Sequence, residues 1–299
     1  MTVLPQELRI DSIKNLYQHK NVHVDVLRSD LVHPVVSGNK WFKLKHYLQQ
    51  ALTQGATRLL TFGGAYSNHI VATAAMCQQQ GLTSIGIIRG EKPAVLSYTL
   101  QDAAAFGMRL YFIPREQYRL KLIPDEVWSQ QDQSATLVVA EGGYGSTGMQ
   151  GAALLLSGSS MSAYSHFAAA VGTGTTVAGI TTVAHPHQKV LGISALKNNV
   201  ELEAAIKGLL PTTMHNRFLL HHQFHFGGYA KHHAQLLQFM NSWYDQTKIP
   251  SDFVYTGKLF YAIDSLIRDD YFKAGSRILI VHSGGLQGNR SLKKGTLIF

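Results

Sequence analysis

The sequence predicts an α/β fold with two open parallel sheets, each forming an αβα domain with helices on both faces. Short apolar runs alternate with helical stretches along almost all of the 299 residues. The runs are continuously apolar, which is typical of strands buried on both faces of a parallel sheet. Glycine-rich turns follow several of them, and ligands of such folds bind at the carboxyl ends of the strands. We therefore expect functional residues in these turns.

The elements expected in chain order follow this alternation. Strands are expected at residues 58–62, 83–88, 109–113 and 136–140, and then at 167–171, 190–194, 218–222 and 277–282. Helices are expected at residues 68–80, 98–106, in a stretch ending near 131, and at 146–156, 177–182, 229–246 and 259–269. Strands that alternate with helices in this way indicate parallel pairing within each sheet.

The composition is that of a globular protein with a small-molecule ligand. Hydrophobic residues make up 45% of the chain and charged residues only 15%, which favours a packed core over disorder. The formal net charge is +9, but the basic residues are scattered. Nucleic-acid binding would gather them in a stripe with aromatic residues, so we expect no nucleic-acid partner. A basic surface does suit anionic small molecules.

Cysteine content and hydropathy favour a cytoplasmic location. Cys77 is the only cysteine, so no internal disulfide can form, which fits a reducing compartment. Residues 1–9 lack the apolar segment of a signal peptide. No apolar run reaches the length that spans a membrane. We therefore expect a soluble protein with no membrane partner.

The turn at residues 172–176 has the features of an anion-binding site. Its sequence, Gly-Thr-Gly-Thr-Thr, lies between an expected strand and an expected helix. Free backbone N–H groups at a helix start, beside small hydroxyl residues, form a cradle for an anion. The turn lacks the Lys ending of a P-loop and the last glycine of a dinucleotide fingerprint, and no acidic residue follows where a ribose would need one. It favours a single phosphate group.

Lys40 is the candidate covalent residue. It follows Gly38-Asn39 and precedes two aromatic residues, Trp41 and Phe42. Apolar rings remove water from an amine and lower its pKa, and a neutral amine is the form that reacts with an aldehyde. On composition alone, however, a helix start with solvent-facing lysines is favoured.

The loop from Gly63 to His69 is a second candidate ligand site. It joins an expected strand to an expected helix. N–H groups at the helix start can bind a carboxylate, and Ser67 and Asn68 add polar side chains. Either side chain could instead cap the helix, and the two roles are compatible.

At these residues the chain resembles the D-cysteine desulfhydrase and 1-aminocyclopropane-1-carboxylate (ACC) deaminase family, which are pyridoxal-phosphate enzymes of the tryptophan-synthase-β fold type. The resemblance runs from about Val24 to Gly288. Its motifs are Gly38-Asn39-Lys40, Gly63-Gly64, Ser67-Asn68-His69, Thr173-Gly174-Thr175-Thr176, Gly228-Tyr229, Val254-Tyr255-Thr256-Gly257-Lys258 and His282-Ser283-Gly284-Gly285. Each motif alone is weak, but chance would not preserve both their order and their spacing.

The resemblance implies residues that bind the cofactor. Lys40 would hold pyridoxal phosphate covalently with Asn39 beside it, Asn68 would bond the phenolic oxygen, and Thr256 would lie beside the ring nitrogen. The phosphate would be bound by Thr173, Gly174, Thr175 and Thr176. No metal is implied.

The resemblance also implies residues that act on a small amino-acid substrate. Ser67 would touch the substrate carboxylate or relay a proton, next to Asn68 and His69. Tyr229 and Tyr255 would lie over the substrate, where a tyrosine gives a proton more easily than it takes one, since its unperturbed pKa is about 10. Packing against the cofactor is an equally good account of Tyr229. With Lys40, these are the expected catalytic residues.

The same resemblance implies the domain organisation. Residues 1–46 and 150–299 would form a larger, cofactor-binding domain, and residues 47–149 a smaller one, with the active site between them. The family also suggests a homodimer.

The expected reaction is α,β-elimination on an amino acid like D-cysteine, giving a keto acid, ammonia and sulfide. ACC deaminases carry glutamate at the position of Thr256, which keeps the ring nitrogen protonated, whereas a threonine hydroxyl can only form a hydrogen bond. Val71 replaces an arginine of many relatives, and Tyr144-Gly145 replaces a Ser-Asn pair. These departures leave the substrate open.

Other functions remain as alternatives. ACC deamination, which opens the ring to 2-oxobutanoate and ammonia, is the second choice, and a non-catalytic protein that carries or senses the cofactor is another. A nucleotide-binding module is disfavoured by the missing ribose acid. His221, His222, His225, His232 and His233 lie close together in the sequence. Without a clear carboxylate or cysteine beside them, a metal site is not expected.

Overall fold

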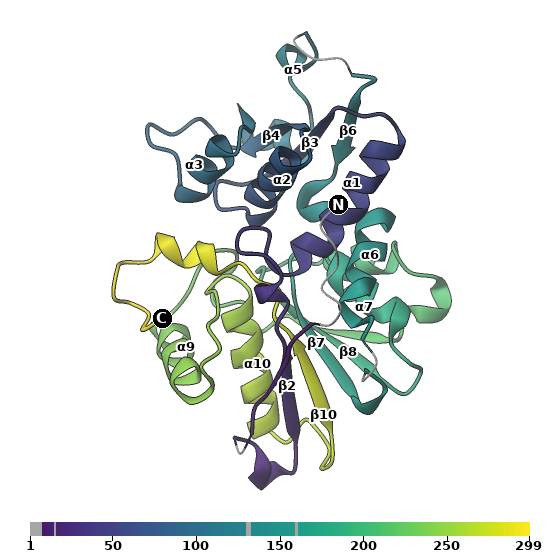
Figure 1. The fold of residues 1–299 in the computed structure, drawn as a ribbon. Coiled ribbons are helices and arrows are strands. Elements are labelled where there is room, and N and C mark those ends of the chain that lie inside the picture. The colour runs from purple at the N-terminus through teal and green to yellow at the C-terminus, as the bar shows by residue number, and fades with distance from the viewer. Residues whose placement is uncertain (1–7, 15, 130–132, 159–160) are drawn as a thin grey trace.

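Two sheets of mostly parallel strands organise the chain (Figure 1). This computed structural model describes residues 8–14, 16–129, 133–158 and 161–299. The larger sheet has six strands in the order β1-β2-β10-β7-β8-β9, and the smaller has four in the order β5-β4-β3-β6. Among the described strands, only the β1–β2 pair is antiparallel. The predicted α/β fold with two parallel sheets is confirmed.

The elements have the following bounds. The large sheet contains β1 (Ile10–Ser12), β2 (His23–Leu27), β7 (His166–Val171), β8 (Lys189–Ser194), β9 (Phe218–His221) and β10 (Arg277–Val281). The small sheet contains β3 (Arg58–Gly63), β4 (Thr83–Arg89), β5 (Arg109–Ile113) and β6 (Thr136–Val139). The α-helices are α1 (Asn39–Thr53), α2 (Asn68–Gln79), α3 (Tyr98–Ala105), α4 (Arg115–Arg119), α5 (Asp125–Ser129), α6 (Ser146–Ala153), α7 (Thr175–Val183), α8 (Leu202–Lys207), α9 (Ala234–Thr247) and α10 (Thr256–Arg268). The 3-10 helices are η1 (Gln18–Lys20), η2 (Ser29–Leu31), η3 (Glu141–Gly143), η4 (Leu154–Leu156), η5 (Met161–Ala163), η6 (Thr212–Met214) and η7 (Leu286–Ser291).

Two predicted helices differ from the structure. The helix expected at 229–246 begins only at Ala234, because Ala230 has φ +53° and the N-cap His233 has extended torsions, neither of which fits a right-handed helix. The stretch expected to end near 131 contains two short helices, α4 and α5, with Pro124 just before the second. Its last residues, 130–132, lie outside the described chain.

A glycine fixes where α1 begins and therefore where Lys40 lies. Gly38, the N-cap of α1, has φ +67° and ψ −150°. A Cβ built on Gly38 would lie 1.9 Å from the backbone oxygen of Ser283, so only glycine fits this close approach. Lys40 is thus in the first turn of α1, beside the loop that follows β10.

One hydrophobic core joins the two sheets. Its buried members include Leu59 on β3 and Val139 on β6, and also Phe167 on β7 and Leu279 on β10. Helix α1 contributes Leu44 between them, and Figure 1 shows α1, α6 and α7 on the same side of the molecule, alongside the junction of the sheets. The division into residues 1–46 with 150–299 and residues 47–149 stays a prediction, and one of its boundaries falls within α1.

Candidate active site

A cavity of about 640 Å³ lies where the carboxyl ends of the two sheets meet. Gly142, after β6 of the small sheet, packs against Thr173, after β7 of the large sheet; a Cβ on Gly142 would lie 2.9 Å from Thr173 Cγ2. Of the twelve residues that the sequence nominates, ten line this cavity, namely Asn39, Lys40, Ser67, Asn68, His69, Thr173, Gly174, Thr176, Tyr229 and Tyr255. Thr175 and Thr256 do not.

Asn39 connects the Lys40 amine to the threonine turn. Lys40 Nζ donates a hydrogen bond to Asn39 Oδ1 at 3.0 Å, and Asn39 Nδ2 donates to Thr176 Oγ1 at 2.7 Å. Burial lowers the pKa of Lys40 to about 8, although the negative charge of Asp252 opposes this change. The lysine faces the cavity, so the solvent-facing arrangement favoured by composition alone is wrong. Its neutral form is therefore far more accessible near neutral pH than that of an ordinary lysine.

Lys43 places a second amine in the cavity. It is only 2% exposed, and its Nζ lies 3.4 Å from the carbonyl oxygen of Gly142. Burial, together with the charge of Lys40, holds the pKa of Lys43 well below its usual range. Two buried amines beside one another are costly without an anion. A bound phosphate would relieve this cost, so the donor set fits a phosphorylated ligand.

The turn at residues 172–176 has the geometry of an anion cradle. Gly174, the N-cap of α7, has φ +84°, and a Cβ there would lie 2.4 Å from Ile206 Cγ1. The hydroxyl oxygens of Thr173 and Thr175 are 3.0 Å apart. The free backbone N–H groups at the start of α7 belong to residues of this turn, and Thr173, Gly174 and Thr176 line the cavity.

The loop between β3 and α2 presents polar atoms that have no partner within the described chain. Ser67 is the N-cap of α2, yet its hydroxyl makes no capping hydrogen bond. Asn68 Oδ1 is buried without a hydrogen bond. Buried polar atoms normally have partners, so this oxygen is positioned for a ligand, and an amide can offer either its oxygen or its NH₂ group. Asn68 Oδ1 is the clearest indication that the site binds a polar ligand.

His69 is a neutral imidazole whose tautomer can be assigned. Thr61 Oγ1 donates its hydrogen to the carbonyl oxygen of Val139 at 2.8 Å and lies 2.9 Å from His69 Nε2. Nε2 must then carry the hydrogen, which leaves Nδ1 as an acceptor without a partner. Burial and the nearby lysines hold the pKa of His69 well below its usual range. His69 can accept a hydrogen bond but cannot act as an acid at neutral pH.

Tyr229 and Tyr255 form a pair of phenols at the cavity. Their ring centroids are 6.2 Å apart, and the Tyr229 hydroxyl donates to the carbonyl oxygen of Tyr66 at 3.2 Å. Burial raises the pKa of Tyr229 to about 12 and that of Tyr255 well above its ordinary value. Both hydroxyls therefore keep their protons at neutral pH and are suited to be donors.

Thr256 does not line the cavity, and its hydroxyl is bonded to Asp252. Its hydroxyl donates to Asp252 Oδ1 at 2.7 Å and accepts from the backbone N–H of Asp252 at 2.7 Å. A hydroxyl has one hydrogen, so in this arrangement Thr256 has none to offer a cofactor ring. Asp252 also accepts hydrogen bonds from the N–H groups of residues 254–256, and it fixes the start of α10. The motif helped to locate α10 but did not reveal Asp252.

Besides Lys43, four charged residues that line the cavity were missed from the sequence, namely Arg89, Lys121, Glu141 and Glu201. Arg89 ends β4, Glu141 follows β6, and Lys121 follows α4. Lys121 Nζ lies 2.5 Å from Glu141 Oε2 and 3.9 Å from the centre of the Tyr118 ring. The carboxyl-end rule for parallel strands could have identified Arg89 and Glu141, but Lys121 had no such signal.

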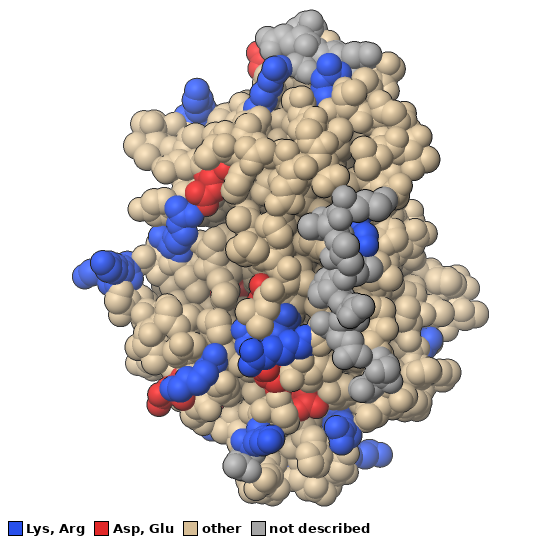
Figure 2. Space-filling view, viewed as in Figure 1, with Lys and Arg blue, Asp and Glu red and all other residues tan. Residues whose placement is uncertain are grey.

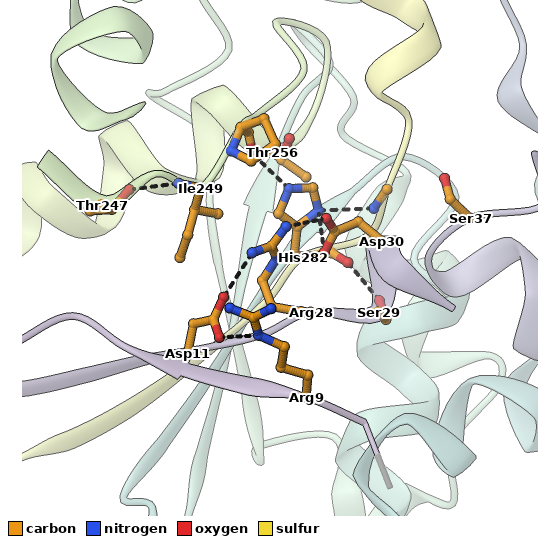
Figure 3. A network of polar contacts seen from close by, with 12 residues as sticks. Arg9, Asp11, Arg28, Ser29, Asp30, Ser37, Thr247, Ile249, Thr256 and His282 are labelled. Carbon is orange, nitrogen blue, oxygen red and sulfur yellow. Dashed lines mark hydrogen bonds and ion pairs between the residues drawn. The ribbon is translucent and has the colours of Figure 1, made fainter. Parts of the chain in front are cut away.

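A buried polar network supports the cavity wall after β10 (Figure 3). The guanidinium of Arg28 lies between Asp11 and Asp30, with N–O distances of 2.8 and 2.7 Å. Asp30 Oδ1 is 3.6 Å from Nδ1 of His282, which accepts a hydrogen bond from the N–H of Gly284 at 3.2 Å. Burial lowers the pKa of His282. Since Gly284 lines the cavity, the network positions part of its wall.

The remaining expectations concern metals, membranes and charge. Among the described residues, no group of three or more His, Cys, Asp or Glu side chains is arranged to hold a metal ion. No described helix is long and apolar enough to cross a membrane. On the face drawn in Figure 2, basic side chains stand in separate groups, several of them beside acidic ones.

Comparisons with known proteins agree with this site. Residues 12–284 match the family described as "Pyridoxal-phosphate dependent enzyme". A Pyrococcus horikoshii protein named "Putative 1-aminocyclopropane-1-carboxylate deaminase" is 26% identical over 96% of this chain and 91% of its own length. The Arabidopsis thaliana protein named "Bifunctional D-cysteine desulfhydrase/1-aminocyclopropane-1-carboxylate deaminase, mitochondrial" is 27% identical over 88% of this chain and 72% of its own length.

A solved structure supports the fold. The crystal structure titled as an ACC deaminase homologue superposes with a TM-score of 0.80, at 24% identity, over 97% of this chain and 92% of its own. At that identity the likeness extends to the arrangement of the sheets and helices alone.

Proposed function

Because the chain belongs to the family of pyridoxal-phosphate-dependent enzymes, we propose that it catalyses α,β-elimination on a small amino acid such as D-cysteine. One water molecule is consumed, and the products are a keto acid, ammonia and sulfide. The substrate class is supported by the desulfhydrase named in the Arabidopsis relative and by the resemblance of the motifs.

One observation carries the proposal: the Lys40 amine and the threonine turn are joined through a single side chain. Asn39 bonds Lys40 Nζ on one side and Thr176 Oγ1 on the other. A ligand with an aldehyde near Lys40 and a phosphate at the turn at residues 172–176 would span this arrangement. Lys43 would add positive charge near the phosphate.

When bound, pyridoxal phosphate supplies an electron sink for the bonds broken next to the substrate nitrogen. The chain's own residues supply binding and proton transfer. Ser67 and the N-terminus of α2 would bind the substrate carboxylate. Lys40, displaced by the substrate amine and with a pKa near 8, would remove the α-proton. Tyr255, which is protonated at neutral pH, would donate to the leaving group, and Tyr229 could do so once its hydroxyl leaves the carbonyl oxygen of Tyr66.

The test is a panel of amino acids with both enantiomers of cysteine and with ACC, scored for keto acid, ammonia and sulfide. We expect sulfide and keto acid in equal amounts from D-cysteine. Borohydride reduction of the holoenzyme should attach the cofactor permanently to Lys40. Lys40→Ala should abolish both turnover and this labelling. Lys45→Ala is the matched control, because Lys45 lies on the same helix but does not line the cavity. Cofactor binding without turnover on any member of the panel would contradict an enzymatic role and favour a carrier.

ACC deamination is the second candidate, because the Pyrococcus and Arabidopsis relatives both have it in their names. The residue at position 256 is a threonine committed to Asp252, and it supplies no charge to a ring nitrogen. For that reason we place elimination first. Release of 2-oxobutanoate from ACC at a higher kcat/KM than D-cysteine turnover would reverse the order.

We further propose a cytoplasmic homodimer with the two-domain division at residues 46/47 and 149/150. The lone Cys77 is buried, and burial raises the pKa of its thiol to about 12, so it is suited to packing rather than to disulfide exchange. Light scattering of the holoenzyme would test the dimer, since a monomeric mass at working concentration would contradict it.

A further inference from the structure

We propose that Arg89 selects substrates whose side chain ends in a negatively charged group, such as a carboxylate or a phosphate ester. This inference rests on the proposed function, because it concerns the substrate of the same cavity. It extends the substrate class beyond D-cysteine to amino acids with an acidic side chain, which Arg89 would favour.

The position of Arg89 places its charge beside the substrate loop. Arg89 is the last residue of β4, which pairs with β3, and the loop after β3 carries Ser67 and Asn68. A Cβ on Gly64 would lie 3.4 Å from Arg89 Nη2, so the guanidinium lies against the start of this loop. Arg89 is exposed at the cavity lining, where a ligand can reach it.

The charge of Arg89 is not matched by an acidic partner within the described residues. Besides the backbone at Gly64, the guanidinium lies near the ring of Tyr118, whose centre is 5.7 Å from Cζ. Glu141, the nearby carboxylate of the cavity, is already paired with Lys121 at 2.5 Å. A guanidinium that faces a cavity with its donors free is well suited to bind a carboxylate or phosphate through two parallel hydrogen bonds.

The α-carboxylate of the substrate has another binding site. The N-terminus of α2 offers N–H groups and the free hydroxyl of Ser67. Arg89 is therefore available for a second anion, at the far end of the substrate side chain. Of the charged groups that affect the pKa of Tyr229, Arg89 has the largest effect, and it lowers this pKa while burial, Glu141 and Asp252 raise it, so the field of Arg89 reaches a group over the substrate.

Such a substrate fits the same elimination chemistry without a redox partner. In O-phosphoserine, for example, the α-proton leaves as H⁺, the Cβ–O bond breaks, and its electron pair departs with phosphate. Addition of one water molecule then yields pyruvate and ammonia. Atoms and electrons balance with no oxidant or reductant.

The kinetic test compares O-phosphoserine with O-acetylserine, in both enantiomers, on the holoenzyme. In Arg89→Met we expect kcat/KM for the anionic substrate to fall about tenfold relative to the neutral one, the size expected for a hydrogen bond to a charged group. Arg89→Lys should retain part of the wild-type preference for the anionic substrate. Arg109→Met is the matched control, because Arg109 is an exposed arginine at the start of β5 that does not line the cavity. It should leave the ratio unchanged.

A binding test separates this inference from the proposed reaction. Aspartate and asparagine have nearly the same size and differ in charge, and their binding to the holoenzyme can be followed through cofactor absorbance without turnover. We expect the wild type to prefer aspartate and Arg89→Met to lose that preference, even if no substrate is eliminated. Equal losses for both ligands would assign Arg89 to the α-carboxylate, and no loss for either would make it an ordinary surface charge. Either result would overturn the inference.

Discussion

Lys258 is a buried lysine whose amine is bonded to backbone carbonyl oxygens and not to a carboxylate. Lys258, on α10, is fully buried, and its Nζ donates to the carbonyl oxygens of Gly228 at 2.7 Å and Ala195 at 3.4 Å. These contacts join α10 to the loop that carries Tyr229. Carbonyl oxygens compensate a buried charge less well than a carboxylate does, and burial lowers the pKa of Lys258 to about 8.

The lowered pKa of Lys258 predicts a stability that rises with pH. Between about pH 8 and pH 10.5 the unfolded chain binds this proton while the folded chain does not, so the free energy of unfolding increases across that window. The share of Lys258 is about 3 kcal/mol. The buried tyrosines act in the opposite direction, since their pKa values are raised in the folded chain. Lys258→Met should therefore give a free energy of unfolding, from urea denaturation, that rises less or falls more between about pH 8 and pH 10.5 than that of the wild type. Lys273→Met, which alters an exposed lysine, should keep the wild-type slope, and equal slopes for all three proteins would refute the prediction.

The site residues that could be located from the sequence are those whose position depends on a backbone turn. Lys40, Ser67 and Gly174 lie at helix starts after glycine-rich turns, and the sequence identifies such turns directly. Thr256 shows the limit, because the acceptor of its single hydrogen is Asp252, and this choice depends on side-chain rotamers. Arg89 was missed because an arginine at a strand end has no motif of its own.

At the scale of elements, three helices are held close by glycines. Helix α6 packs against both α1 and α7. A Cβ on Gly151 of α6 would lie 2.4 Å from the backbone oxygen of Phe42, and a Cβ on Gly179 of α7 would lie 2.6 Å from that of Met149. These contacts set the distance between α1 and α6, and therefore the position of Lys40 on α1.

Gly151→Ala is expected to push α1 away from α6. Because the obstacle is backbone and cannot rotate aside, the substitution should destabilise the protein by about 1–3 kcal/mol and weaken cofactor binding. Gly208→Ala is a suitable control: Gly208 has φ −64°, and its nearest contact would be an ordinary 3.4 Å. Urea midpoints and cofactor titration would measure both effects. A Gly151→Ala protein as stable as Gly208→Ala would show that the helices can separate freely.

Helices and strands could be predicted where one hydrophobic pattern runs without interruption along the segment. The continuously apolar strands β7, β8 and β10 lie within a residue or two of their predicted bounds. Strand β2 was not predicted, because His23 and Asp25 interrupt its apolar run, and Asp25 is satisfied by the distant Tyr164 hydroxyl at 2.8 Å. Helix α9 was extended too far back because the backbone torsions at Ala230 and His233 cannot be read from hydropathy.

At the scale of the whole molecule, the shared core predicts that the two sheets unfold together. Trp128 packs beside the small sheet, and Trp243 packs in the core under the large sheet. In proteins that keep only one of these tryptophans, the fluorescence midpoint in urea should coincide with the midpoint from far-UV circular dichroism. If the Trp128 signal were lost at lower urea than the circular dichroism signal of the same protein, the small sheet would unfold independently.

The order of the large sheet also has a consequence for biosynthesis. Strand β10 is the last described strand to leave the ribosome, yet it lies in the interior of the sheet, between β2 and β7. Until residues 277–281 emerge, both neighbours have unpaired inner edges, which are templates for association with other chains. Translation that stalls late would therefore release a nearly full-length product that is prone to aggregate and has no completed pocket, and the nascent chain would benefit from a chaperone that shields those edges.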